Sequence, residues 1–220
     1  MALKGIFAAR PQSENNGGGI IGTFRTGIVK RGRPVSLETF RVTTDDADVA
    51  ETIEQLFGGD TLENDSDKES IQVMTESNEA RILVHSIDSA FSVWANNALV
   101  RTCNGFVQLS GDAAGQPCPC AELDLEGRKA YAKQGGCKPD IRVVFQLADA
   151  PDLGKFQFRS GAWTLAESIQ TAEAAVDAAR TAADEDDAEF VPVAGKLAIE
   201  KVTNKAGDKT FTLPRVTVKK

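Results

Sequence analysis

The sequence contains one histidine, His85, and one tyrosine among its 220 residues. A single histidine excludes a histidine-rich metal site. It also leaves little basis for a serine or cysteine triad, which needs an imidazole beside its nucleophile. His85 ends a strand-like segment with no cysteine near it in sequence, so we expect it to be structural. The scarcity of aromatic residues also argues against a platform for stacking nucleic-acid bases.

Phosphate-binding motifs are absent as well. No Gly-x-Gly-x-x-Gly unit opens a helix, and no Walker-type loop occurs. Glycines 17–19 precede a strand-like segment, which is the wrong context for a phosphate loop, so they indicate a linker. No apolar segment approaches the ~20 residues that cross a bilayer, and residues 1–10 lack the long apolar run of a signal peptide. We therefore expect a cytoplasmic protein with no membrane partner and no small-molecule substrate.

The net charge is −7, and the isoelectric point is about 4.9. Tight non-specific binding to nucleic acid depends on neutralising phosphates with lysine and arginine, so this balance argues against it as the main activity. Basic residues nevertheless gather in segments 20–42 and 196–220, and acidic residues gather in 60–69 and 184–187. Solvated surface is the default interpretation of such clusters. A basic face lying beside a DNA-bound partner remains open.

All the cysteines of the chain lie in a turn-rich stretch of 35 residues: Cys103, Cys118, Cys120 and Cys137. Such a group forms either two disulfides or one tetrahedral metal site, and zinc is the usual ion in an all-thiolate site. Thiols stay reduced in the cytoplasm, which favours the metal. Four thiolates leave no position for a catalytic water. We therefore predict a structural Zn²⁺ and no catalytic residues.

The first half of the chain predicts a β-hairpin over 20–43, followed by one amphipathic helix. Thr44 or Asp45 is expected to cap this helix, and Gly58-Gly59 to end it. Its apolar stripe is Val49, Ile53, Leu56 and Phe57. We expect an acidic loop at 60–69, strands at 70–75, 80–85 and 106–109, and a buried Trp94 within an ambiguous segment 91–100.

The second half predicts a short basic helix within 123–134, and then strands 140–147 and 155–160 joined by a turn at 150–154. A long helix is expected over 163–181, with its narrow apolar seam packed on the protein's own sheet. The seam consists of Leu165, Ile169, Ala172, Val176 and Ala179. A last hairpin is expected over 196–218.

These elements predict the α+β class: antiparallel β-hairpins with two main helices and a four-cysteine zinc-binding insertion. We expect a flexible lead-in at 1–19 and a main domain at 20–182 that includes the insertion at 101–139. An acidic linker at 183–195 would join the main domain to a C-terminal hairpin, 196–220, that packs on it.

Several stretches, specific in combination, resemble one known family. The N-terminal ones are Gly22–Gly27, Gly32–Pro34, Phe40–Thr43, Phe57–Gly59 and Thr75–Ser77. The cysteine stretches are Arg101–Gly105, Gln116–Cys120 and Cys137–Pro139, and the last are Ala148–Gly154, Phe156–Phe158 and Ser160–Trp163. Together they resemble the recombination directionality factor-like proteins of actinobacterial phages. The chain departs from the family at Asn104, where aspartate is more usual, and in its alanine-rich helix seam.

The resemblance implies a phage- or prophage-encoded accessory protein in the bacterial cytoplasm, and not an enzyme. Such a factor binds a large serine integrase directly and touches DNA only through it. It switches the integrase from attP × attB integration to attL × attR excision. One alternative is a zinc-stabilised single-strand DNA-binding or replication accessory protein, which would bind oligonucleotides with a steep salt dependence. Another is a metal-dependent hydrolase, but that needs an open coordination position and a general base.

Overall fold

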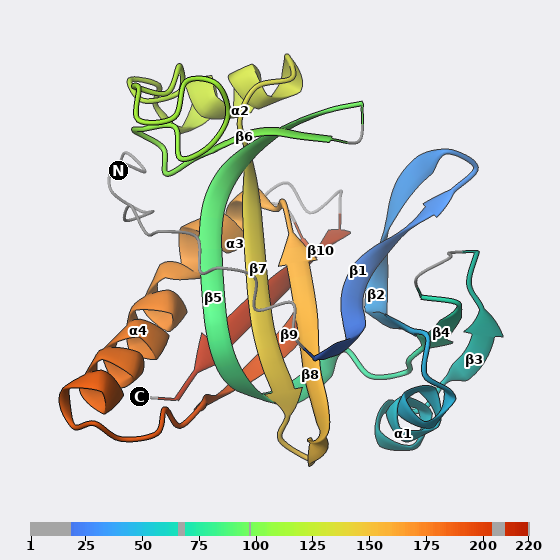
Figure 1. Ribbon diagram of the computed structural model, residues 1–220. Helices are drawn as coiled ribbons and strands as arrows, with labels where there is room; N and C mark the ends of the chain where they lie inside the picture. The colour runs from blue at the N-terminus through green and yellow to red at the C-terminus, as the bar shows by residue number, and fades with distance from the viewer. Residues whose placement is uncertain (1–18, 66–68, 97, 204–209, 220) are drawn as a thin grey trace.

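The computed structural model describes residues 19–65, 69–96, 98–203 and 210–219. Within these residues the strands form one curled, 10-stranded sheet in the order β10-β9-β5-β7-β8-β1-β2-β4-β3, with β6 paired to β5 off this path (Figure 1). The β1–β8 pair is parallel, and the other pairs are antiparallel. The strands are β1 (Ile20–Lys30), β2 (Arg33–Thr44), β3 (Asp60–Glu63), β4 (Ile71–Met74), β5 (Glu79–Ala95), β6 (Ala98–Cys103), β7 (Lys138–Leu147), β8 (Ala150–Ser160), β9 (Val193–Thr203) and β10 (Thr210–Val218).

The described residues are mostly β with four helices, whereas two main helices and one short basic helix, within 123–134, were predicted. The helices are α1 (Ala47–Phe57), α2 (Leu125–Lys133), α3 (Trp163–Ser168) and α4 (Gln170–Glu185). The helix predicted over 163–181 is thus interrupted at Ile169. The backbone at Ile169 stays helical, with φ of −72° and ψ of −21°, and its N–H donates to the carbonyl of Leu165 at 2.8 Å, so α4 follows α3 after a single residue. Among the described residues, no helix has the length and apolar character needed to cross a membrane.

The first hairpin, β1–β2, and the helix after it are confirmed, but the predicted cap is wrong. Asp46 is the N-cap, since its carboxylate accepts from the backbone N–H groups of Asp48 and Val49 at 2.9 and 3.2 Å. The Thr44 hydroxyl donates to the carbonyl of Ile21 at 2.6 Å and accepts from the N–H of Asp46 at 3.2 Å, so it bonds to the residue before the helix and not to the first helical N–H groups. The helix ends as predicted, with Gly58 at a positive φ of 66°.

Part of the acidic segment 60–69 is a strand, so the predicted loop is wrong there. Residues 60–63 form β3, which pairs with β4 and is exposed along its whole length. This is the edge of the sheet, where charged side chains face water while the backbone still pairs on one side. At 106–109 a strand was predicted, and this prediction is wrong. The structure has only isolated bridges there, between Cys103 and Gln108 and between Val107 and Pro117.

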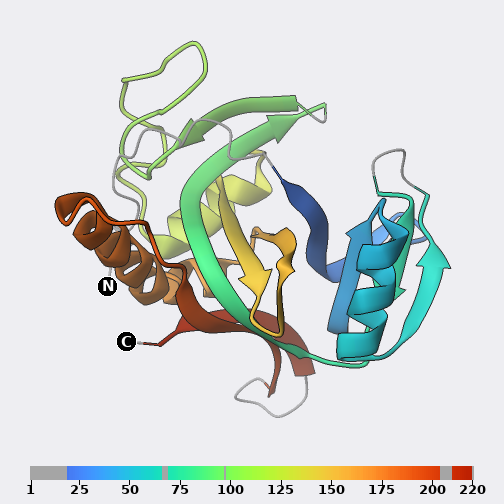
Figure 2. The same cartoon turned by 60° about the horizontal axis from the view of Figure 1, so that its bottom comes forward.

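Strand β5 is 17 residues long and lies inside the sheet between β9 and β7, third from the β10 edge. It includes both the strand predicted at 80–85 and the first half of the ambiguous segment 91–100, and Figure 2 shows it arching across the molecule. Trp94 is not a core residue, as its side chain is 50% exposed. The pairing of β5 with β7 stops at Ser92. Beyond this point β5 pairs with β6 alone among the described strands, and the register partner of Trp94 is Leu99. Phe91, three residues earlier on the same strand, is buried instead.

The core contains a cluster of phenylalanines from distant parts of the chain. Phe24 lies edge-to-face against Phe40, Phe57, Phe145 and Phe156, with ring centroids 5.3 to 5.9 Å apart. Such pairs add to the free energy gained from burial alone. The cluster joins β1, β2, β7, β8 and α1, so it ties the N-terminal hairpin to the middle of the sheet.

Helices α3 and α4 pack on β5 and β10, which confirms that the apolar seam faces the protein's own sheet. Leu165, Ile169, Ala172 and Val176 are buried there, and Ala179 is half-buried. The β7–β8 hairpin is confirmed, with its turn at 148–149 instead of 150–154.

The C-terminal hairpin, β9–β10, belongs to the same sheet, because β9 pairs with β5 from Glu79 to Val84. Irregular backbone between α4 and β9 covers residues 186–192, a shorter stretch than the 183–195 predicted as a linker. Apart from Gly19, the predicted lead-in lies outside the described residues.

Candidate metal centre

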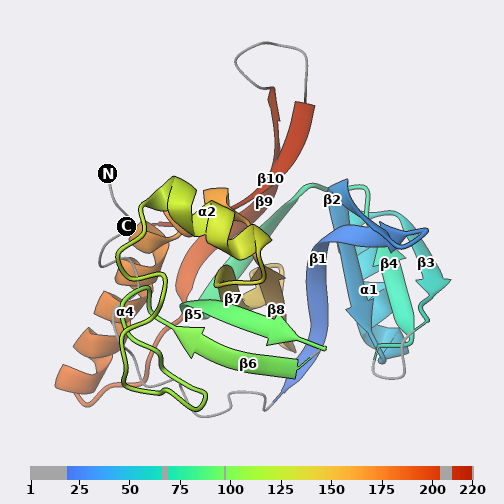
Figure 3. The ribbon, with the colours of Figure 1, turned by 90° about the horizontal axis from the view of Figure 1, so that it is seen from above.

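The cysteine-rich insertion connects β6 to β7 and lies over one end of the sheet, as seen from above in Figure 3. Cys103 is the last residue of β6, and Cys137 immediately precedes β7. Both strands pair with β5, where Phe91 is the register partner of Cys103 on one side and of Pro139 on the other. Strand β5 therefore brings together two cysteines that are 34 residues apart in sequence.

The other two cysteines come from a tight turn. The N–H of Cys118 donates to the carbonyl of Phe106 at 2.7 Å, and the N–H of Ala121 donates to the carbonyl of Cys118 at 2.9 Å. Asn104 organises the start of this loop, since its side-chain oxygen accepts from the N–H groups of Phe106 and Val107 at 3.0 and 2.8 Å. An aspartate would accept the same bonds, which explains why asparagine is tolerated at this position.

The four sulfur atoms converge on one point. They all lie within 4.8 Å of one another, and all four residues are buried. The Cys118–Cys120 and Cys118–Cys137 sulfur separations are 3.3 and 3.5 Å. Cys103 lies 3.6 Å from Cys120 and 3.8 Å from Cys137. All four cysteines are free, so the disulfide alternative is not what the structure contains.

These separations fit a tetrahedral ion. Zinc–thiolate bonds of about 2.3 Å in tetrahedral geometry place sulfur atoms about 3.8 Å apart. The donor set consists of four soft sulfur ligands from residues that are already buried together. The cluster can therefore hold a metal ion without rearrangement of the fold.

The electrostatics of the cluster also favour a cation. Interaction with Cys103 lowers the pKa of the Cys118 thiol, and the same interaction raises the pKa of the Cys103 thiol. Ionisation of one sulfur opposes ionisation of its neighbours, because like charges this close repel each other. Four ionised sulfurs can coexist here only if positive charge is placed among them.

His85 lies away from this cluster, on β5 in a mixed polar environment. Its Nε2 is 2.6 Å from the side-chain oxygen of Gln146, and its backbone carbonyl accepts from Arg180 at 2.7 Å. Burial lowers the pKa of His85 below its ordinary value. Within the described residues, the group that could hold a metal ion consists of cysteines alone.

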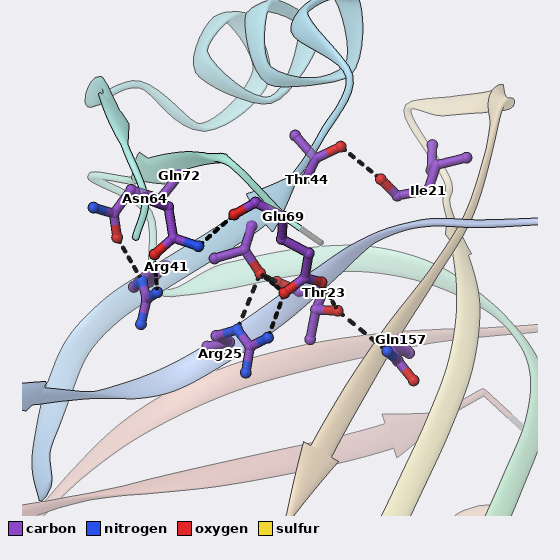
Figure 4. Close-up of polar contacts among 10 residues, drawn as sticks. Ile21, Thr23, Arg25, Arg41, Thr44, Asn64, Glu69, Gln72 and Gln157 are labelled. Carbon is purple, nitrogen blue, oxygen red and sulfur yellow. Dashed lines mark hydrogen bonds and ion pairs between the residues drawn. The ribbon is translucent and has the colours of Figure 1, made fainter. Parts of the chain in front are cut away.

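Sequence reasoning missed a second polar cluster, centred on Glu69. This residue was expected in a solvated acidic loop, but its carboxylate accepts from Thr23, Arg25 and Thr43 (Figure 4). Gln157 of β8 donates to the Thr23 hydroxyl at 3.2 Å. The cluster therefore fastens the segment before β4 to the first hairpin. The sequence contains one sign of this cluster, the alternation of threonine and arginine on β1 and β2. That pattern does not show which acidic residue these side chains bind.

Arg41, beside this cluster on β2, makes its own bonds to Gln72 and Asn64 at 2.7 and 2.9 Å. Burial is the main cause that lowers the pKa of Arg41. The polar groups around Glu69 and Arg41 thus hydrogen-bond to one another. Their role is to hold neighbouring strands together, and they do not form a binding site for a ligand.

No solved structure matches this chain. The family model named Gp3-like, described as recombination directionality factor-like, matches residues 21–219. That range contains the first hairpin, the cysteine insertion and the last hairpin, so the match confirms the resemblance seen in the sequence. On this evidence the chain belongs to the recombination directionality factor-like family.

Proposed function

We propose that this protein is a recombination directionality factor that binds a large serine integrase. Bound to the integrase, it favours attL × attR excision over attP × attB integration. The observation that carries the proposal is the family match over residues 21–219. The site of action would be the cytoplasm of a bacterial host that carries the phage or prophage.

The proposed mechanism is differential binding, and no chemistry is assigned to the protein itself. A factor shifts an equilibrium only to the extent that it binds one arrangement of the integrase more tightly than another. A net charge of −7 suits docking on a protein better than direct binding to DNA, so DNA contact would be indirect. A closed four-thiolate site has no position for a reactive water, which supports a non-catalytic role.

The metal in this proposal is a structural Zn²⁺ held by Cys103, Cys118, Cys120 and Cys137. When bound, the ion would supply a fixed tetrahedral junction between the end of β6, the Cys118–Cys120 turn and the start of β7. The residues themselves keep the insertion folded against β5 and exclude water from the sulfur atoms, since all four are buried. A rigid insertion loses little conformational entropy when it binds a partner, so it suits a docking surface.

Recombination in vitro tests the proposal. The serine integrase encoded by the same genome is first shown to be active on attP × attB. It is then given attL × attR with and without this protein. Excision that depends on the added protein, together with inhibition of attP × attB recombination, is the expected result. An integrase that is active on attP × attB but produces no excision with the protein present would refute the role.

A second candidate, a single-strand DNA-binding or replication accessory protein, is favoured by one surface feature. Lys30, Arg31 and Arg33 at the tip of the β1–β2 hairpin are exposed, and none forms an ion pair with another described residue. Such a tip could follow a phosphate backbone.

Fluorescence anisotropy with a labelled oligonucleotide at several salt concentrations tests this candidate. Tight binding that weakens steeply with salt, and that is lost in the triple variant K30A/R31A/R33A, would support it. K201A is the matched control, because Lys201 is paired with Glu38 at 2.6 Å. Binding that is weak in all three proteins would leave the directionality role as the better account.

A further inference from the structure

Arg128, on α2, is the largest fully buried side chain with a formal positive charge among the described residues, at 2% exposure. Its Nε donates to the carbonyl of Leu123 at 3.0 Å, and its Nη2 donates to the carbonyls of Gly105 and Ala121 at 3.0 and 3.3 Å. Its guanidinium lies over the ring of Phe91. These contacts satisfy hydrogen bonds, but none of them neutralises the charge.

A buried guanidinium without an anion is costly, because removing a charge from water costs several kcal/mol that only close negative charge can offset. No carboxylate forms an ion pair with Arg128 in the part of the chain that the structure describes. Its Nη1 instead points to the sulfur of Cys120 at 3.9 Å. Among the described groups that contact Arg128, this sulfur is the one that can become negative.

A second arginine, on β6, approaches the cysteine cluster. Arg101 on β6 places Nη2 3.8 Å from the sulfur of Cys137 and 2.8 Å from the hydroxyl of Tyr131. Arg101 is half-buried and also takes no part in an ion pair with a described carboxylate. The two guanidinium groups therefore contact two different sulfur atoms, and each cysteine already belongs to the converging set.

We infer that Arg101 and Arg128 are the counter-cations of the cysteine centre, and that this centre is an anion of net double negative charge. Four thiolates around one divalent ion carry that charge, and two guanidinium groups balance it. Neutral thiols or disulfides would leave Arg128 as an isolated buried cation. Arginine suits the position because its guanidinium is weakly hydrated and always charged. The inference rests on the proposed structural metal, but it is independent of any integrase.

Metal affinity of the purified protein tests the inference without recombination. Zinc is titrated in competition with the chromophoric chelator 4-(2-pyridylazo)resorcinol, and cobalt substitution reports the thiolate ligands through sulfur-to-metal charge-transfer absorption. Removing a charge beside the ligands should weaken zinc binding about 10- to 100-fold in R101M and in R128M, as is usual for groups that surround a metal site. R101K, which keeps the charge, should stay within a few-fold of the native protein.

Arg81 provides the matched control, since it lies at the other end of β5 and is paired with Asp149. R81M should bind zinc like the native protein. If R128M does not fold, R101M still decides the matter because Arg101 is only half-buried. Native affinity in R101M, or equal losses in R101M and R101K, would overturn the inference. A purified native protein that binds no divalent metal would overturn it as well.

Discussion

The guanidinium of Arg128 lies over the ring of Phe91, with 5.4 Å between Cζ and the ring centroid. The same ring lies 5.8 Å from that of Trp163 at the start of α3. Phe91, a residue of β5, thus contacts both the cysteine insertion and a helix that covers the sheet. Through this residue, loss of order in the insertion is expected to reach the sheet.

Replacing Phe91 by alanine should destabilise the protein by about 3–5 kcal/mol, the usual cost of removing a buried phenylalanine ring. Trp94, on the same strand and 50% exposed, is the matched aromatic control. W94A should change the free energy of unfolding by roughly 0.5 kcal/mol or less. Urea unfolding of both variants measures the difference. Similar losses in the two would show that Trp94 is packed after all.

Removing the metal should lower stability and loosen the insertion first. An ion that binds only the folded state adds about 4 kcal/mol when its free concentration is a thousand times its dissociation constant. A zinc chelator should therefore lower the unfolding midpoint of the native protein. It should also increase hydrogen exchange at residues 104–136 before exchange in β1 and β2. C120S serves as the control, because it should be less stable from the start and respond little to the chelator.

Two glycines with positive φ should respond differently to alanine. At Gly59, with φ of 104°, an added Cβ would overlap the carbonyl oxygen of Met74 on β4, whereas at Gly32, with φ of 73°, it would meet nothing. G32A should cost about 1–2 kcal/mol from the left-handed backbone alone. G59A should cost an additional ~1–3 kcal/mol, because β4 must move. Thermal unfolding of the two variants compares them directly, and equal losses would contradict the predicted clash.

Glu69 should make stability depend on pH in the acidic range. Burial by itself raises the pKa of Glu69, but hydrogen bonds from Thr23, Arg25 and Thr43 outweigh it, so the pKa lies below the ordinary value of 4.5. A lowered carboxyl pKa contributes stability that is complete above the unfolded-state value. That contribution disappears as the pH falls through the folded-state value.

The free energy of unfolding of the native protein should therefore exceed that of E69Q at pH 7, and the gap should narrow below about pH 5. Chemical denaturation at several pH values gives both quantities. E79Q is the control, since Glu79 forms an exposed pair with Lys196 and such pairs contribute little. A gap that is constant from pH 7 to pH 3 would rule out the ionised carboxylate as its source.

Local patterns were sufficient for several elements. The turn between β1 and β2 and the apolar stripe of α1 depend on neighbours within a few residues. The turn was predicted correctly, and so was the stripe except at Leu56, which is 39% exposed. The grouping of the cysteines was equally visible, because four identical side chains in one insertion need no knowledge of the sheet. These features depend on spacing along the chain.

The errors about which residues are buried or paired share one cause, which is pairing between distant segments. Whether Trp94 is buried depends on where β7 ends, and whether 60–63 forms a strand depends on β4. Glu69 has an ordinary acidic context in sequence, and Arg128 an ordinary basic one. Neither context indicates that one carboxylate accepts three hydrogen bonds or that one guanidinium is buried against a sulfur atom.

By itself, then, the sequence determined which residues are available: four sulfur ligands in one insertion, the hairpins around it and the motifs of the family. Only the tertiary structure decided how they meet. The sheet order places β5 between β7 and β9 and also pairs it with β6, so that Cys103 and Cys137 converge and Arg101 and Arg128 reach their sulfurs. The physical reason is that burial and charge pairing arise between segments far apart in the chain, where local spacing carries no information about distance.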